Sequence, residues 1–229
     1  MAEREARLAR VVEHAPDTRS LFLRLPPGER LEFRPGQFVS CLLPVPSSCT
    51  SATAERIIRP YSLASSPDDP ELELCLNLVP GGPGSHHLFH LTEGAVVHFT
   101  GPWGTFVLDR APDAEAVFIA DGTGIAPIRP MLRRALATAR HRLHLLHGID
   151  GPALYGDELT ALARDQSILT VEHVPSARLR DEVVRRWIDA DDERRRHFFV
   201  CGVGDIVRTL RDLLRRGGYE RRAVQYEKW

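Results

Sequence analysis

Short apolar segments separated by proline and glycine fill the first half of the chain. Predicted strands cover Arg19–Leu25, Gly36–Leu43, Leu72–Val79 and Ala95–Thr100, and each is followed by a proline or glycine turn. Many short strands with turn residues between them are typical of an antiparallel barrel or sandwich. The pattern therefore predicts an antiparallel β domain over residues 1–111.

The pattern changes near residue 112, where apolar strands begin to alternate with helical segments. Residues 116–120 form a continuous apolar run, as expected of a buried parallel strand. Apolar residues then recur at the spacing of one helix face, at Ile128, Met131, Leu132, Ala135 and Leu136. Further strands are expected at residues 143–146, 168–174, 197–201 and 223–226, and a last helix at residues 206–214. Such repetition predicts a doubly wound parallel sheet over residues 112–229.

The composition narrows the range of functions. With 229 residues and a formal net charge of −1, the chain has no global attraction to nucleic acid or to anionic membranes. No apolar run approaches the ~20 residues of a membrane span, and Met1–Arg10 contains no signal-peptide core. The four cysteines, Cys41, Cys49, Cys75 and Cys201, form no close pair, which argues against a zinc site or an iron–sulfur cluster within the chain. We expect reduced thiols and a cytoplasmic location.

The segment Arg59-Pro60-Tyr61-Ser62 carries three side chains that suit a flavin. Arginine holds phosphate through charge-assisted hydrogen bonds, tyrosine offers a flat ring for stacking, and a serine hydroxyl can bond to the flavin atom N5. Downstream, Gly81–Ser85 combines glycines, which let backbone N–H groups approach a pyrophosphate, with a hydroxyl and the start of a short helix. The alternatives are an ordinary strand with a partly buried tyrosine, and a plain hairpin loop.

In the second half, Gly122-Thr123-Gly124 lies between a buried strand and a helix, the setting in which a glycine turn cradles phosphates. Pro127 suits an early helical position. Asp121 precedes the turn and would sit near anionic phosphates, bind a ribose, or face away. Cys201-Gly202 ends a later strand, where the cysteine is either part of a site or a small buried apolar residue.

Six strings in this order resemble the ferredoxin–NADP reductase family: RPYSLAS, GGPGS, GPWGTF, DGTGIAP, CG and a final EKW. The resemblance spans about Arg19 to Trp229. It implies an antiparallel Greek-key β-barrel that binds flavin, followed by an α/β doubly wound parallel-sheet domain that binds the nicotinamide nucleotide. It also implies that the flavin is FAD, that hydride comes from NAD(P)H, and that electrons pass to a separate protein such as ferredoxin, flavodoxin or an oxygenase component.

The resemblance also implies roles for individual residues. Those expected at the flavin are Arg59, Tyr61, Ser62, Leu76, Leu78, Gly82, Gly84 and Ser85. Those expected at the nicotinamide nucleotide are Gly122, Thr123, Gly124, Ile125, Pro127, Cys201 and Gly202. Ser62, Cys201 and Glu227 would orient hydride transfer. Trp229 would stack on the flavin face opposite Tyr61 and act as a gate that moves aside for the nicotinamide. The alternative for Trp229 is a frayed tail.

The choice between NADH and NADPH depends on the charge beside the adenosine ribose. Asp150 stands where many NADPH-using relatives have arginine, and a carboxylate there would repel a 2′-phosphate. Ser176, Arg178 and Arg180 could instead form a phosphate pocket. We expect a modest preference for NADH.

Two other functions are compatible with the same residues. One is an NAD(P)H:free-flavin reductase on the same fold, and the other is a non-catalytic flavin-binding module that senses redox state. The histidines His86, His87 and His90, and likewise His141, His144 and His147, are not expected to bind metal. A row of arginines on the last helix (Arg208, Arg211 and Arg215) either is a solvated face or steers an acidic partner.

Overall fold

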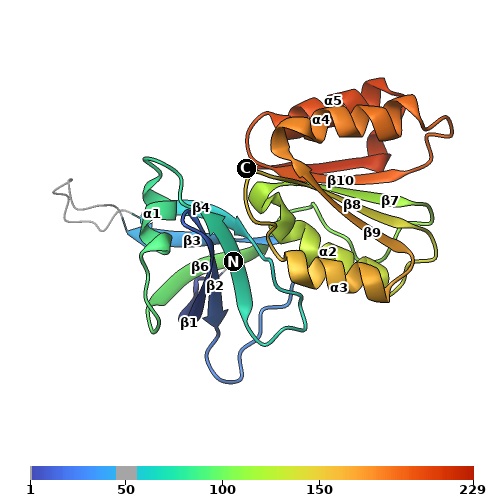
Figure 1. The fold of residues 1–229 in the computed structure, drawn as a ribbon. Helices are drawn as coiled ribbons and strands as arrows, with labels where there is room; N and C mark the ends of the chain where they lie inside the picture. The colour runs from blue at the N-terminus through green and yellow to red at the C-terminus, as the bar shows by residue number, and fades with distance from the viewer. Residues whose placement is uncertain (1, 45–55) are drawn as a thin grey trace. The chain divides into compact units, whose positions relative to one another are not determined.

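The computed structural model describes residues 2–44 and 56–229, so Cys49 lies outside the described residues. The chain divides into two compact units, Met1–Val107 and Leu108–Trp229 (Figure 1). Residues at the start of the second unit are tied to its first helix: the Asp109 carbonyl accepts a hydrogen bond from Arg134 at 2.8 Å, and the Ala111 N–H donates to Thr138 Oγ1 at 3.0 Å.

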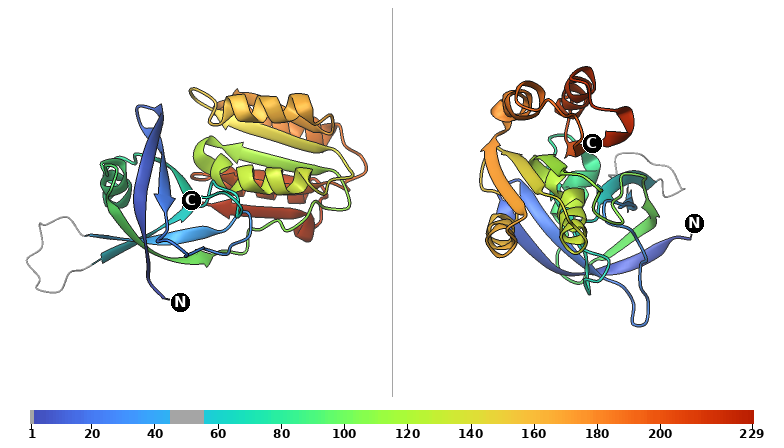
Figure 2. Two further views of the ribbon diagram at one scale, coloured as in Figure 1. Left: turned by 90° about the horizontal axis from the view of Figure 1, so that it is seen from below. Right: turned by 90° about the vertical axis from the view of Figure 1, so that its right-hand side faces the viewer.

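The first unit is an antiparallel six-stranded barrel. Its strands are β1 (Arg4–Ala15), β2 (Thr18–Arg24), β3 (Phe38–Pro44), β4 (Arg56–Ser62), β5 (Leu72–Asn77) and β6 (Val96–Trp103). They are hydrogen-bonded in the order β4-β3-β6-β1-β2-β5, and a bridge between Leu63 and Leu74 joins the two ends. Figure 2 shows the strands curving around one another. This order has the Greek-key connections that the family resemblance implies.

Period-two alternation explains why these segments form strands. In β1, Ala6 and Leu8 face the core while Glu5 and Arg7 face outward. The sequence pattern does not predict β1, because charged residues occupy its outward positions and hide the apolar ones. The helix α1 (Pro83–Phe89) packs Leu88 and Phe89 into the same core, which confirms the short helix expected after the glycine turn.

The second unit is a five-stranded parallel sheet between two helical layers. Its strands are β7 (Ala116–Asp121), β8 (Leu143–Ile149), β9 (Leu169–Pro175), β10 (His197–Gly202) and β11 (Val224–Lys228), in the order β11-β10-β7-β8-β9. Its helices are α2 (Ile125–Leu136), α3 (Gly156–Asp165), α4 (Leu179–Val183), which continues into a π-helical turn (Val184–Asp189), and α5 (Ile206–Arg216). In Figure 1, α4 and α5 cover one face of the sheet, and α2 and α3 cover the other.

The strand order places a topological switch point between β7 and β10. From β7 the chain moves outward first through β8 and β9, and then returns to add β10 and β11 on the other side. In open α/β sheets, ligands bind at the carboxyl ends of the strands beside such a switch point. The predicted strands of this unit and its first and last helices are confirmed.

Within the described residues, no helix is both long and apolar enough to cross a bilayer.

Candidate functional site

In the first unit, the two predicted flavin motifs lie against each other. Gly84, in the first turn of α1, packs on β4 so closely that a methyl group there would come within 2.7 Å of Arg59 Cγ and 3.3 Å of Tyr61 Oη. Glycine at this position therefore lets the Gly81–Ser85 turn approach the Arg59 and Tyr61 side chains. Arg59 and Gly84, which are 25 positions apart in the sequence, thus contribute to one surface.

Along β4 the side chains become progressively more buried. Arg59 is exposed, Tyr61 is half-buried, and Ser62 is 7% exposed. Burial raises the pKa of the Tyr61 phenol, which therefore stays neutral. Ser62 Oγ is buried and has no hydrogen-bond partner among the described residues. Because a buried hydroxyl without a partner costs free energy, it suits a position that bonds to a ligand.

The glycine turn before α1 is braced from within. Ser85 Oγ accepts a hydrogen bond from the Val79 N–H at 3.0 Å and donates to the Gly82 carbonyl at 3.0 Å. The hydroxyl of Ser85 therefore fixes the shape of the turn. Leu76 lies in the barrel core and is 3% exposed, so only its backbone could contact a cofactor, whereas Leu78 is partly buried at the edge of the same core.

In the second unit, the predicted phosphate turn lies directly after β7. Gly122–Gly124 form a single 3₁₀ turn that leads into α2. A methyl group on Gly124 would lie 2.2 Å from the Cys201 carbonyl oxygen and 2.7 Å from Gly202 Cα. The turn and the end of β10 are therefore in backbone contact, which joins two of the predicted motifs. Ile125 and Pro127 are buried in the first turn of α2, so the Ile125 side chain belongs to the core.

Cys201 and Glu227 are neighbours across the sheet. Strands β10 and β11 run parallel with Cys201 opposite Glu227 and Gly202 opposite Lys228. Cys201 is 1% exposed; burial raises the pKa of its thiol well above the usual value, and the Glu227 carboxylate raises it further. The thiol is thus protonated at neutral pH, which suits a weak hydrogen-bond donor better than a thiolate nucleophile.

Trp229 continues the pairing of β11. Its N–H donates to the Gly202 carbonyl at 3.2 Å, and its backbone oxygen accepts from the Gly204 N–H at 3.1 Å. An ion pair of 3.0 Å between Lys228 and Asp205 lies beside them. The backbone of the last residues is therefore held, and any movement of the indole that keeps these bonds is a side-chain rotation.

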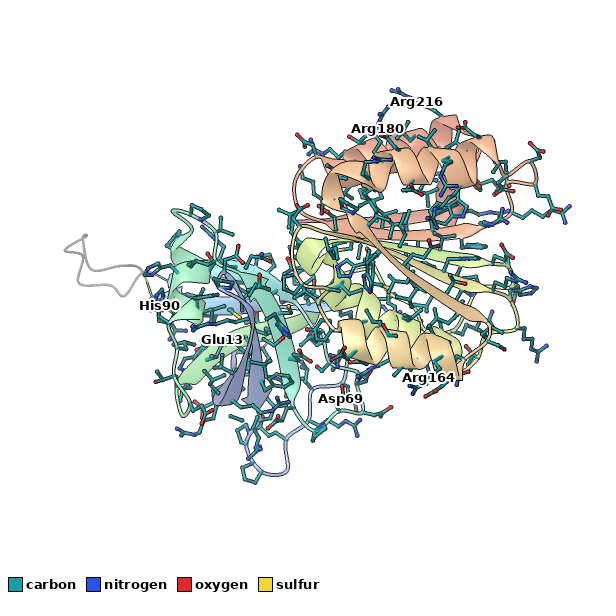
Figure 3. The ribbon with its side chains drawn as sticks, viewed as in Figure 1. Glu13, Asp69, His90, Arg164, Arg180 and Arg216 are labelled. Carbon is teal, nitrogen blue, oxygen red and sulfur yellow. The ribbon has the colours of Figure 1, made fainter. Side chains whose placement is uncertain are left out.

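Three polar side chains gather at the carboxyl ends of β7, β8 and β9. Burial raises the pKa of the Asp121 carboxyl; a hydrogen bond with Ser176 opposes that shift, and the nearby Asp150 charge adds to it. Asp150 itself is exposed directly after β8. Arg178 is also exposed, and Arg180 lies on the outer side of the helical layer, 3.3 Å from Asp181 (Figure 3).

One residue at this edge has no sequence motif to mark it. His147, in β8, is fully buried, and its Nε2 lies 3.0 Å from the Gly122 carbonyl oxygen. Burial lowers the pKa of the imidazole to about 4. A single histidine within an apolar strand does not indicate in the sequence which residue it will contact. Only the packing of the folded chain therefore reveals this contact with the phosphate turn.

The two units together define a class of protein. A Greek-key barrel bears an arginine, a tyrosine and a buried serine beside a glycine turn, which fits a flavin. A doubly wound sheet bears a glycine phosphate turn against a buried cysteine at its switch point, which fits a nicotinamide nucleotide. This combination is that of a flavin- and nicotinamide-dependent oxidoreductase.

Comparisons with known proteins agree with this class. The oxidoreductase FAD-binding domain matches residues 5–108, and the oxidoreductase NAD-binding domain matches residues 118–212. Ferredoxin–NADP reductase B of Sorangium cellulosum is 33% identical over 98% of this chain and 97% of that protein. The ferredoxin reductase component of 3-ketosteroid-9-alpha-monooxygenase from Mycobacterium tuberculosis is 33% identical over 92% of this chain but 61% of its own length.

Solved structures share the fold. A ferredoxin NADP+ reductase from Neisseria gonorrhoeae, with FAD and NADP bound, has a TM-score of 0.80 at 21% identity and covers 99% of this chain and 98% of its own. A cytochrome P450 reductase from Amycolatopsis has a TM-score of 0.79 at 29% identity, covering 99% of this chain and 70% of its own. The chain belongs to the ferredoxin–NADP reductase family, with an FAD-binding and an NAD-binding domain.

Proposed function

We propose that this protein takes hydride from NAD(P)H and delivers electrons to a separate protein acceptor. The observation that carries the proposal is the packing of Gly124 on the backbone of Cys201, with Glu227 opposite that cysteine. This contact joins the phosphate turn to the two residues expected beside the nicotinamide. Bound FAD supplies the ability to accept a hydride and to release its electrons one at a time.

The side chains have separate tasks in this proposal. Arg59 binds the flavin phosphate, Tyr61 packs on the flavin ring, and Ser62 donates its hydroxyl proton toward N5. The protonated Cys201 thiol and Glu227 orient the nicotinamide. Trp229 covers the flavin and rotates aside when the nicotinamide binds, and its fixed backbone supports a rotation of the indole alone.

The acceptor is proposed to be a ferredoxin, a flavodoxin or an oxygenase component. The names of the relatives support this choice, since they include a ferredoxin–NADP reductase and reductase components of a ketosteroid monooxygenase and of naphthalene 1,2-dioxygenase. The chain spans nearly the whole of the first of these but less than two thirds of the other two. A cytoplasmic location is part of the proposal.

Anaerobic stopped-flow spectroscopy tests the proposed function. NADH or NADPH should bleach the bound flavin, and an added ferredoxin should then restore its colour. A purified protein that is colourless and reduces only added FMN would favour the free-flavin reductase. Bound flavin that neither nucleotide bleaches would favour the redox-sensing module.

We further propose a preference for NADH. Asp150 is exposed beside Asp121 and Ser176, so a 2′-phosphate placed there would meet two carboxylates. Exchange of Asp150 for arginine should raise kcat/KM for NADPH relative to NADH by roughly tenfold, because it replaces a repulsive charge with an attractive one. Steady-state kinetics with both nucleotides measures the ratio. An unchanged ratio would remove Asp150 as the reason for any preference.

A further inference from the structure

The carbonyl group of Gly122 has two hydrogen-bond donors. One is the N–H of Ile125, at the start of α2. The other is His147, whose Nε2 lies 3.0 Å away. A carbonyl oxygen has two lone pairs, so these donors use both of them. The orientation of the Gly122–Thr123 peptide is therefore fixed from the α2 side and from β8.

The direction of this carbonyl determines the direction of the next amide. A peptide bond is planar and trans, so the Thr123 N–H points opposite to the Gly122 carbonyl. His147 is fully buried, and its hydrogen bond draws the carbonyl toward the interior of the sheet. The Thr123 N–H consequently points outward from the turn, toward the side where a phosphate would lie. Gly122 has φ +52°, a conformation that glycine adopts without strain.

The imidazole has a definite protonation state in this arrangement. A carbonyl oxygen only accepts, so His147 must carry its proton on Nε2. His173 lies opposite His147 on β9, with the ring centroids 5.5 Å apart. Neither the Nδ1 atom of His147 nor the ring nitrogens of His173 have a hydrogen-bond partner among the described residues.

We propose that His147 is a positioning residue for nucleotide binding: its Nε2–H holds the Gly122 carbonyl inward and thereby aims the Thr123 N–H at a phosphate of the nicotinamide nucleotide. The inference rests on the proposed function and adds to it a residue outside the glycine motif. His147 touches the turn and acts only through it. Its effect is therefore on nucleotide binding, and the chemical step is spared.

Two variants separate positioning from simple packing. His147→Leu keeps the volume but removes the donor, and His147→Gln places an amide N–H at a similar reach. His144→Leu is the matched control, because His144 is on the same strand, three residues away, and faces the other side of the sheet. All three should be compared for FAD content and melting temperature before binding is measured.

Isothermal titration of the FAD-loaded protein with NAD+ and with NADP+ gives the first measurement. His147→Leu should weaken binding of the preferred nucleotide by about tenfold, as expected for one lost hydrogen bond in the turn. KM for the reduced nucleotide should rise by a similar factor while kcat stays within about twofold. The reason is that the lost hydrogen bond stabilises the bound nucleotide equally in the ground state and in the transition state. His147→Gln should recover most of the affinity, and His144→Leu should retain it.

Nitrogen-15 NMR of histidine-labelled protein gives the second measurement, which needs no nucleotide. At pH 7, His147 should be neutral with its proton on Nε2. A proton on Nδ1, or unchanged affinity and KM in a folded His147→Leu variant, would overturn the inference. A wild-type protein that binds neither nucleotide would overturn the proposed function itself, and with it the role of His147 in binding.

Discussion

Gly124→Ala tests whether the contact between the phosphate turn and β10 is necessary for nucleotide binding. The added methyl group would lie 2.2 Å from the Cys201 carbonyl oxygen and 2.5 Å from its carbonyl carbon. Both are backbone atoms, so no side chain can rotate away. To bring the methyl group to an ordinary van der Waals distance from these atoms, the start of α2 must move by about 1 Å relative to β10.

This displacement should have two consequences of different size. Overpacking of a tight interior typically costs about 1–3 kcal/mol of unfolding free energy, so the second unit should be less stable by that amount. A misplacement of about 1 Å at a binding turn can cost about a hundredfold in rate, so kcat/KM for the nucleotide should fall by a factor of that order. FAD content should change little, because the residues proposed to contact the flavin, other than Trp229, lie in Met1–Val107.

Anaerobic stopped-flow reduction and thermal unfolding provide the two readings. Gly151→Ala is the first control, because nothing lies within 4 Å of its added methyl group, and it should leave both readings unchanged. Gly217→Ala is the second control, because its methyl group would lie 2.4 Å from Ile188 Cδ1, away from the turn. Because the end of the Ile188 side chain can rotate away, Gly217→Ala should lower stability by less than Gly124→Ala does, and it should not lower kcat/KM. A Gly124→Ala protein that reduces its flavin at the wild-type rate would refute the reasoning.

Three further predictions concern single side chains. Ser62→Ala should retain FAD but slow flavin reduction by about tenfold, because the hydroxyl available for N5 is lost; stopped-flow absorbance measures this, and an unchanged rate would exclude that role. Trp229→Ala should speed reoxidation of the reduced flavin by oxygen by roughly threefold or more, measured by mixing with aerated buffer, and no change would argue against a gate. His147 should make the protein less stable in acid: its pKa is 6.5 when unfolded and about 4 when folded, so the unfolded state binds more protons between these values. The unfolding free energy should therefore fall as the pH drops from 6.5 toward 4, by up to about 3 kcal/mol more than it does in His147→Gln. Denaturant unfolding at several pH values measures this, and the same loss of unfolding free energy with pH in both proteins would contradict it.

Local patterns predict most of the second unit, because its strands are buried on both faces and its helices have one apolar face. The run at residues 116–120 is nearly the whole of β7, and the apolar face from Ile128 to Leu136 lies in α2. The first unit is harder, since β1 is half exposed and its charged residues obscure the alternation. The α3 and α4 helices, at residues 156–165 and 179–183, are short and rich in charged residues, and the sequence pattern does not single them out.

The candidate site is only partly predictable for a related reason. Glycine and serine in known strings mark the positions of the turns, but the contacts between turns depend on how distant segments pack. The closeness of Gly84 to Arg59, and of Gly124 to Cys201, follows from tertiary structure alone. The pairing of Cys201 with Glu227 needs the register of two strands, and the hydrogen bond of His147 needs the depth at which β8 is buried.

The backbone contact of Gly124 also bears on redesign of coenzyme choice. Gly124 cannot be replaced by a larger residue without displacing β10, so substitutions at this position will damage recognition of both coenzymes alike. Asp150 and Arg178, in contrast, are exposed at the ends of other strands and can be exchanged without repacking the interior. A library aimed at switching between the two coenzymes should therefore randomise the segments after β8 and β9 and leave the glycine turn untouched.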